Sequence, residues 1–193
     1  MSADFRLRSA FQMKKTLIIC VLALFFISTA FAANSKIRVS GSPYALQGST
    51  SSKDGEDPVW SKYGLGLEAV YQKGITDSIF VEVGIGTNRF FMPCDRPVFS
   101  DFLVFAGAGY MHNLNEKWTM NVHLDAGIDF LSYKSKSSNS LTLLGGVGAS
   151  YSLKENLDLT FGLDVSAGFA KKSGADYVNY RFLPKGGVSL DLK

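Results

Sequence analysis

Strict two-residue alternation, held over long stretches, is the feature that most restricts how this chain can fold. Between Trp118 and Leu131 every second residue is apolar, and the residues between them are polar or small. The same pattern runs from Leu157 to Phe169. Successive side chains of a strand point to opposite faces, so each stretch predicts a strand with one apolar face. Both stretches exceed the ~5–6 residues of an ordinary strand and suit a tilted membrane strand of ~9–11 residues with overhang.

An internal repeat organises these strands into hairpins. Gly66–Tyr71, Gly107–Tyr110 and Gly146–Tyr151 each lead into a short polar turn and a new alternating strand. The repeat predicts three hairpins, and further strands near Ile37–Ala45 and Tyr180–Leu192 bring the total to eight. The predicted fold class is therefore all-β, an eight-stranded antiparallel up-and-down transmembrane β-barrel.

The predicted connections alternate in length. Short polar segments form the tight turns, at Lys73–Asp77, Asn113–Lys117 and Leu153–Asn156. Longer segments form the other connections, at Gln47–Pro58, Phe90–Phe99, Ser132–Asn139 and Ala170–Val178. Short turns on one side and longer loops on the other are typical of outer-membrane barrels, whose long loops face away from the cell.

The composition of the polar faces indicates which side of the wall meets lipid. Across the three strands from Trp118 to Phe169, these faces carry Gly, Ser, Thr, Asn, Asp and one His, with no Lys or Arg. A solvated outer face would accept long charged side chains, whereas a narrow lumen favours small ones. Aromatic residues also gather at the strand ends, as interfacial girdles do: Tyr71, Tyr110, Trp118 and Tyr151 at one end, and Tyr63, Phe102, Phe130, Phe169 and Phe182 at the other. The alternative is a soluble barrel with its apolar face inside.

Residues 1–33 have the parts of a secretory signal peptide. Met13-Lys-Lys precedes an apolar run from Thr16 to Ile27, and Ala30-Phe-Ala32 supplies a cleavage motif. The run is shorter than the ~20 residues that a membrane helix needs. A start codon assigned upstream of Met13 would account for residues 1–12. We therefore expect a signal peptide at 1–33 and one barrel domain at 34–193.

Charge and cysteine content exclude other classes. Cleavage after Ala33 removes four basic residues and one acidic residue, so the formal charge falls from +3 to zero and no basic patch points to nucleic acid. Cys20 lies in the apolar run behind the bulky Ile19, which argues against lipidation. Cys94 is then the one cysteine of the mature chain, so no internal disulfide forms, although an intermolecular one is conceivable.

Two hairpin segments, Tyr63–Tyr71 and Gly145–Thr160, resemble those of the small outer-membrane barrels of the OmpX, OmpA-transmembrane and OmpW kind. The resemblance covers most of residues 34–193. It implies a protein of the cell outer membrane, in contact with lipid and inserted by the barrel-assembly machinery. These barrels usually end in an aromatic residue, whereas this chain ends in Leu192-Lys193.

Strand parity places a set of charged side chains in the lumen. Its members are Arg38, Glu68, Glu82, His123, Asp125, Asp129, Asp158, Asp164, Arg181 and Lys185. Charges enclosed by a low-dielectric wall must find partners, so the set predicts a structural network of ion pairs. His123 and Asp125 share a face, but no Ser or Cys accompanies them as a nucleophile, and metal binding would need a third ligand that the sequence does not identify. We expect no enzyme, cofactor site or metal site.

Apolar members of the same face converge near the outer mouth: Leu103, Phe105, Leu131, Leu144 and Leu183. They plug the barrel's upper end or, as the OmpW resemblance implies, form a pocket for a small hydrophobic molecule. Pro43 and Pro184 fall on the first and last strands, which must pair to close the barrel. Because proline donates no ladder hydrogen bond, they mark a weakened seam with a lateral exit, or simply bulges.

The sequence thus favours a non-enzymatic outer-membrane barrel that binds or passes small hydrophobic molecules. An eight-stranded barrel is too narrow for a general aqueous porin. The alternative is a surface module in which loops such as Ser49–Asp57 and Ser132–Asn139 contact host molecules.

Overall fold

The computed structural model describes residues 35–51, 63–91, 99–133, 136–172 and 175–192. These residues form nine strands: β1 (Ser35–Ser42), β2 (Leu46–Ser51), β3 (Tyr63–Gly74), β4 (Ile79–Phe91), β5 (Phe99–Asn113), β6 (Trp118–Tyr133), β7 (Lys136–Lys154), β8 (Leu157–Lys172) and β9 (Ala175–Leu192). Among the described residues, no helix is long and apolar enough to cross a bilayer. The predicted signal peptide and Cys94 lie outside the described residues.

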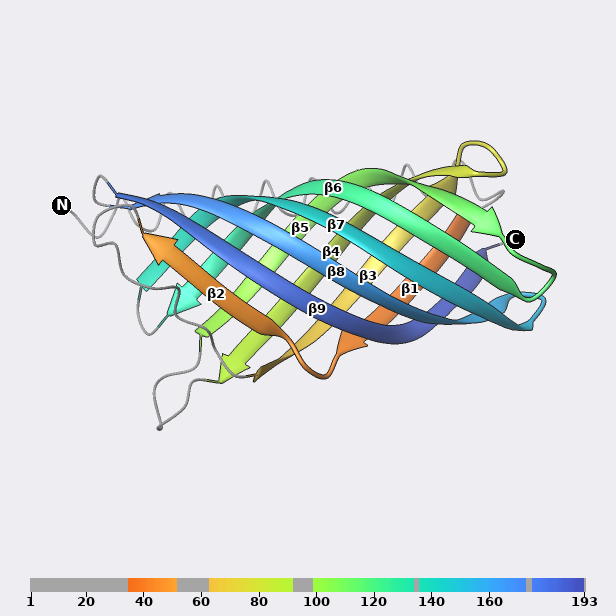
Figure 1. The fold of residues 1–193 in the computed structure, drawn as a ribbon, viewed down its shortest axis with the longest axis horizontal. Coiled ribbons are helices and arrows are strands. Elements are labelled where there is room, and N and C mark those ends of the chain that lie inside the picture. The colour runs from red at the N-terminus through yellow and green to blue at the C-terminus, as the bar shows by residue number, and fades with distance from the viewer. Residues whose placement is uncertain (1–34, 52–62, 92–98, 134–135, 173–174, 193) are drawn as a thin grey trace, which may run out of the picture. The chain divides into compact units, whose positions relative to one another are not determined.

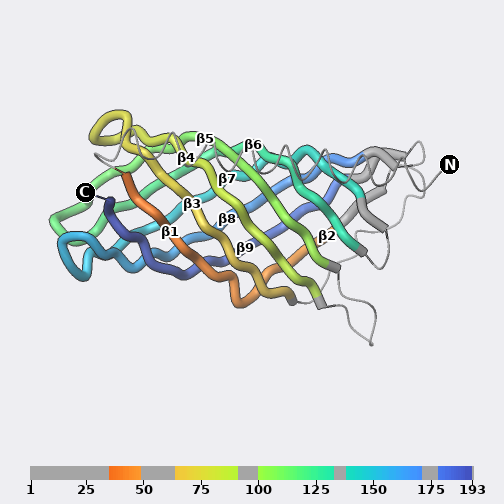
Figure 2. The backbone as a smooth tube through the Cα atoms, turned by 180° about the vertical axis from the view of Figure 1, so that it is seen from behind, coloured from red at the N-terminus to blue at the C-terminus, as the bar shows by residue number. Residues whose placement is uncertain are grey.

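The strands close into a barrel by antiparallel pairing of sequence neighbours. From β3 to β9 each strand pairs with the next, and β1 pairs with both β3 and β9 (Figure 1). β2 continues the direction of β1 and pairs with β9. Figure 2 shows the start of β1 beside the end of β9, where Ser35 is the register partner of Leu192. Because β1 and β2 are two halves of one interrupted strand, the prediction of a closed eight-stranded up-and-down barrel is confirmed.

The distribution of polar and apolar side chains is the reverse of that in a soluble protein. Large apolar side chains cover the outside, and Leu124 is 68% exposed. Its neighbours in the chain, His123 and Asp125, point into the lumen and are buried. In water this arrangement would expose a broad apolar surface while burying charge, whereas in lipid it satisfies both faces. The expected outward direction of the apolar face is confirmed.

Aromatic rings meet across neighbouring strands at both ends of the wall. At the tight-turn end, the rings of Trp118 and Tyr151 lie 5.0 Å apart. At the other end, the rings of Phe102 and Phe130 lie 6.3 Å apart. Both pairs are direct register partners, as aromatic pairs on adjacent strands prefer. They stand at the levels where interfacial girdles are expected.

The tight turns fall where the sequence predicts them. Each is short: residues 75–78 join β3 to β4, 114–117 join β5 to β6, and 155–156 join β7 to β8. In the second turn, the Asn115 carboxamide oxygen accepts hydrogen bonds from the backbone N–H groups of Lys117 and Trp118, at 2.9 and 3.0 Å. This Asx-type arrangement explains why a turn-forming residue stands there.

Three of the predicted long connections are shorter than expected. β2 covers Leu46–Ser51 and so occupies the first part of the predicted loop Gln47–Pro58. β6 extends to Tyr133 and β7 starts at Lys136, so Ser132–Asn139 is mostly strand. Likewise β8 extends to Lys172 and β9 starts at Ala175, within the predicted loop Ala170–Val178. Apolar alternation stops near the membrane boundary, but the backbone ladder does not require it. The backbone pairing of both hairpins therefore continues beyond the apolar band.

The first strand changes register against β9 where Pro43 occurs. Gly41 pairs with Gly186, and Leu46 pairs with Phe182. Four residues of the first strand therefore face three residues of β9, which is the signature of a β-bulge. One extra residue exchanges the two faces of a strand. Before the bulge the even-numbered residues of the first strand point inward, and after it the odd-numbered residues do. Ala45 is therefore fully buried inside the barrel.

A charge placed on the outer wall tests the membrane orientation. We expect Leu124→Arg to destabilise the barrel by about 2–4 kcal/mol, because an arginine would face the bilayer midplane. The matched change Leu114→Arg, at an exposed leucine of a tight turn, is expected to cost at most about 1 kcal/mol. Urea unfolding in lipid vesicles measures both. Equal and small effects of the two substitutions would contradict the lipid-facing assignment.

Candidate functional site

The outer half of the lumen contains a buried ion-pair cluster around Arg181. The guanidinium of Arg181 contacts the carboxylates of Asp129 and Asp101, the latter at 3.2 Å. Asp101 also accepts hydrogen bonds from the backbone N–H and the side-chain amide of Asn88, both at 2.9 Å. Parity in the sequence places Arg181 and Asp129 in the lumen but overlooks Asp101, because the preceding residues read as loop. Its even spacing from Leu103 and Phe105 could have revealed it.

A second cluster joins five strands in the middle of the lumen. Lys185 on β9 contacts the carboxylates of Glu68 on β3 and Asp164 on β8. Arg38 on β1 lies 3.8 Å from Glu68 and 3.5 Å from Glu82. These contacts bridge the seam between first and last strands, so they help to hold the barrel closed.

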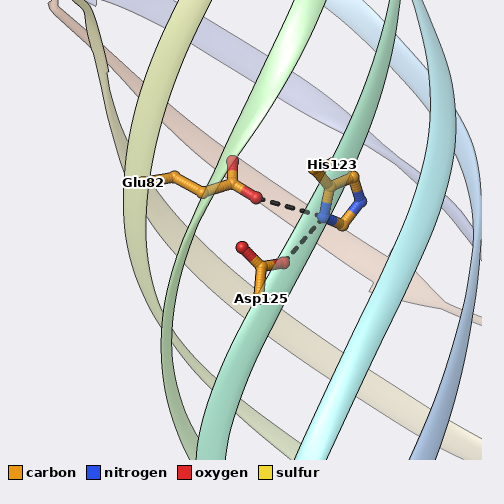
Figure 3. Close-up of side chains that lie close together, drawn as sticks. All are labelled: Glu82, His123 and Asp125. Carbon is orange, nitrogen blue, oxygen red and sulfur yellow. Dashed lines mark hydrogen bonds and ion pairs between the residues drawn. The ribbon is translucent and has the colours of Figure 1, made fainter.

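His123 lies at the centre of a group of three carboxylates. Its Nδ1 is 2.7 Å from Asp125 Oδ2 and 3.2 Å from Glu82 Oε1, and Figure 3 shows both carboxylates pointing at this nitrogen. Its Nε2 lies 3.3 Å from Asp164 Oδ1. The partners come from β4, β6 and β8, so the histidine ties together strands that are not neighbours.

A third cluster closes the lumen at the tight-turn end. The Lys36 ammonium lies 3.0 Å from both Asp158 and Asp191. The Ser152 hydroxyl donates to Asp158 at 2.8 Å. Together the three clusters bring every charged lumen residue that parity predicts into contact with a partner.

Apolar side chains fill the space between the Arg181 and His123 clusters. Leu103, Phe105 and Leu144 pack with Val70. The predicted mouth residues do not form one group, because Leu183 packs separately with Ala45 and Phe90. Leu131, also buried, is the register partner of Asp101.

The mouth differs from the purely apolar one expected. Along β5, Asp101 stands nearer the outer end than Leu103 and Phe105, so the Arg181 cluster lies on the outer side of the apolar packing. The void beside Leu103, Leu144 and Leu183 has a volume of about 20 Å³. This is room for a water molecule rather than an organic solute.

A much larger cavity lies on the outer face of the wall, beside Pro43 and Pro184. This lateral groove has a volume of about 800 Å³ and is lined by Gly41, Ser42, Pro43, Leu65, Gly66, Leu67, Thr87, Arg89, Pro184, Lys185 and Gly186. Four of these residues also line the small void inside the lumen: Ser42, Gly66, Leu67 and Lys185. The groove and the lumen are therefore separated by one layer of wall at the bulge.

The arrangement around His123 is one of mutual ion pairing. In the described part of the chain, the hydrogen-bond and ion-pair partners of His123 are carboxylates. A nucleophilic mechanism would place a hydroxyl or thiol within reach of the imidazole. The arrangement instead holds charges in mutual contact.

A closed antiparallel barrel with an apolar exterior, aromatic girdles and an ion-paired lumen defines the class: this chain is a transmembrane β-barrel of the outer-membrane type. A family model described as a domain of unknown function (DUF6268) matches residues 102–171. No curated protein matches the sequence.

Comparison with the solved structure of Neisserial surface protein A supports the fold. Neisserial surface protein A is 16% identical over 82% of this chain and 97% of its own, with a TM-score of 0.60. OprG from Pseudomonas aeruginosa is 11% identical over 82% of this chain and 97% of its own, with a TM-score of 0.49. Ail of Yersinia pestis is 17% identical over 80% of this chain and 99% of its own, with a TM-score of 0.40.

Removal of the central cation of the outer cluster tests its structural role. Arg181→Leu leaves Asp101 and Asp129 buried without their counter-charge, so we expect a loss of about 3–5 kcal/mol in the free energy of unfolding. Adding Asp101→Asn and Asp129→Asn should recover part of that loss. Lys117→Leu, in an exposed turn, is the control and should change stability by less than about 0.5 kcal/mol. Urea titration followed by tryptophan fluorescence measures all three. A tolerated Arg181→Leu would refute a structural role for the cluster.

Proposed function

We propose that this protein is an integral outer-membrane barrel without catalytic activity that binds a small hydrophobic molecule in the lateral groove. The observation that carries the proposal is the position of the groove, directly over the register change between the first strand and β9. In a regular barrel the ladder of backbone hydrogen bonds is continuous, so the closed wall normally has no recess.

The voids described inside the lumen are far smaller. Its charged clusters bridge opposite walls, and the described voids inside it measure about 20 Å³ each. The lateral groove is therefore the better candidate for a solute, and its volume lies in the ~300–1,000 Å³ range of small-molecule sites.

The chemistry of the lining favours an apolar guest. Leu65, Leu67 and the two prolines supply carbon surface, and Gly186 leaves the floor open, since a Cβ there would meet nothing within 4 Å. Arg89, the register partner of Leu65, stands at the outer end of the groove. A molecule with an apolar body and one polar or anionic end matches this arrangement.

The seam supplies a route between the groove and the interior. Proline lacks the N–H that a ladder hydrogen bond needs, so Pro43 and Pro184 weaken the wall on both of its closing strands. Leu183, next to Pro184, packs inward against Ala45 and Phe90. An apolar molecule moving between the membrane and the buried Leu183 cluster would pass the layer formed by Ser42, Leu67 and Lys185, which line both the groove and the void inside the lumen.

The alternative function is adhesion through the outer loops. Segments 52–62 and 92–98, with Cys94, lie outside the described part of the chain, whereas the predicted loop Ser132–Asn139 is mostly strand. Adhesion to host surface molecules is therefore tested as one outcome of the uptake experiment described next.

Filling the groove tests the proposal. Gly186→Trp should reduce entry of a fluorescent hydrophobic probe into cells to the level of cells without the protein, because the indole would occupy the groove. Gly145→Trp is the matched control, since Gly145 also faces outward with space for a Cβ, on β7. Leu103→Asp and Pro184→Ala test the inner packing and the seam. Unchanged uptake in all of these variants, with loss of surface adhesion on loop replacement, would favour the alternative.

The packed lumen also predicts electrical behaviour. We expect no steady ionic current when the purified protein is inserted in a planar bilayer, because bridging ion pairs and apolar side chains block the axis. A stable open conductance in salt solution would show that the lumen opens and would contradict the lateral route.

A further inference from the structure

Beyond hydrophobic binding, we propose that Glu82, His123 and Asp125 form a binding site for a divalent transition-metal ion such as Zn²⁺. The sequence offers His123 and Asp125 on one face of β6 but no third ligand. The fold supplies Glu82 from β4, and one donor atom of each residue lies within 4.8 Å of the others. Figure 3 shows the Glu82 and Asp125 carboxylates both turned toward His123 Nδ1, so that the three donors lie together.

The distances are those of a site that needs little rearrangement. Tetrahedral zinc holds nitrogen at ~2.0–2.1 Å and carboxylate oxygen at ~2.0–2.2 Å, which places neighbouring ligand atoms ~3.3 Å apart. His123 Nδ1 lies 3.2 Å from Glu82 Oε1 and 2.7 Å from Asp125 Oδ2. One imidazole with two carboxylates suits zinc and related transition metals better than Mg²⁺ or Ca²⁺.

Two buried carboxylate oxygens point to an absent ligand. Glu82 Oε1 and Asp125 Oδ1 are inaccessible to solvent and accept no hydrogen bond in the described structure, although both side chains are fully buried. Buried carboxylate oxygens normally find donors, since leaving one unpaired costs free energy. A cation between them would satisfy this need.

The surrounding residues have the arrangement that supports a metal-bound histidine. A ligating histidine usually donates its other ring N–H to a carboxylate, which fixes the tautomer. Here Nε2 faces Asp164 at 3.3 Å, and Lys185 contacts Asp164 in turn. Arg38 contacts the other oxygen of Glu82, Oε2, at 3.5 Å, which leaves Oε1 free to face His123.

Charge balance favours a divalent ion. Four carboxylates (Glu68, Glu82, Asp125 and Asp164) share this region with two permanent cations, Arg38 and Lys185. With a neutral imidazole the group carries two excess negative charges, and one divalent ion cancels them. A protonated histidine would cancel one.

Glycines on the intervening strands make the convergence possible. Gly107 is the register partner of both Glu82 and Asp125, and a Cβ there would collide with Asp125 Oδ1. Gly146 is likewise the register partner of both His123 and Asp164, and a Cβ there would collide with their side chains. Side chains from alternate strands can therefore meet across a strand that contributes no bulk.

Binding of Zn²⁺ and Co²⁺ to the untagged, folded barrel in detergent, after treatment with a chelator, tests the site. We expect one ion per chain by calorimetry and the visible absorption of tetrahedral Co²⁺, with no competition from Mg²⁺. His123→Gln and Glu82→Gln should abolish the absorption, and the control His112→Gln, at the exposed second histidine, should retain it. Asp164→Asn, a positioning change, should weaken binding by about 10–100-fold.

Folding of each variant is checked by heat-modifiable gel mobility. If the His123 and Glu82 variants do not fold, nitrogen NMR of the histidine-labelled native protein decides, because Zn²⁺ must then shift the His123 Nδ1 signal. An unshifted signal at saturating Zn²⁺ overturns the proposal. Retention of the Co²⁺ absorption in a folded His123→Gln barrel overturns it as well. Neither measurement depends on solute uptake, so it is independent of the proposed function.

Discussion

Charges in this barrel are enclosed by a wall that is itself surrounded by hydrocarbon, and each must be compensated inside the lumen. Arg181, Lys185 and Arg38 do this by bridging strands that are distant in sequence, such as β5 with β9 and β3 with β9. An uncompensated ion in a low-dielectric interior costs several kcal/mol. The ion pairs therefore restrict which strands can lie opposite one another across the lumen. The apolar exterior provides insertion into lipid, while the lumen pairs define the arrangement of the inner faces. Glycines such as Gly107 and Gly146 then decide where long side chains have room to meet.

Strand parity was enough to predict most of this organisation from the sequence. A two-residue period assigns every position of a regular strand to one face, which is why Asp129, Asp164 and Arg181 could be placed in the lumen before any coordinates. Parity also predicted that Leu124 and the other apolar residues at every second position of its strand face outward. The number of strands followed from the hairpin repeat, since each tight turn returns the chain to the adjacent position.

Parity failed where strands lose regularity or where contact depends on register. Ala45 turned inward because the bulge at Pro43 exchanges the two faces. Asp101 was missed because polar residues at a strand end read as loop, and the same misreading shortened β6 to β9. Glu82 could not be matched to His123, because a two-residue period specifies a face but not how far one strand is displaced along its neighbour. That displacement accumulates around the barrel and is set by turn lengths, which a periodic pattern does not encode.

The division of the first strand has a consequence for how the barrel shuts. β1 is held between β3 and Gly186–Leu192 of β9, whereas β2 pairs, within the described part of the chain, with Tyr177–Phe182 of β9. β9 therefore pairs with two segments of the first strand, β1 and β2, each in its own register. Among the described residues, the segment nearer the tight turns is paired along both of its edges, whereas the segment nearer the long connections is paired along one.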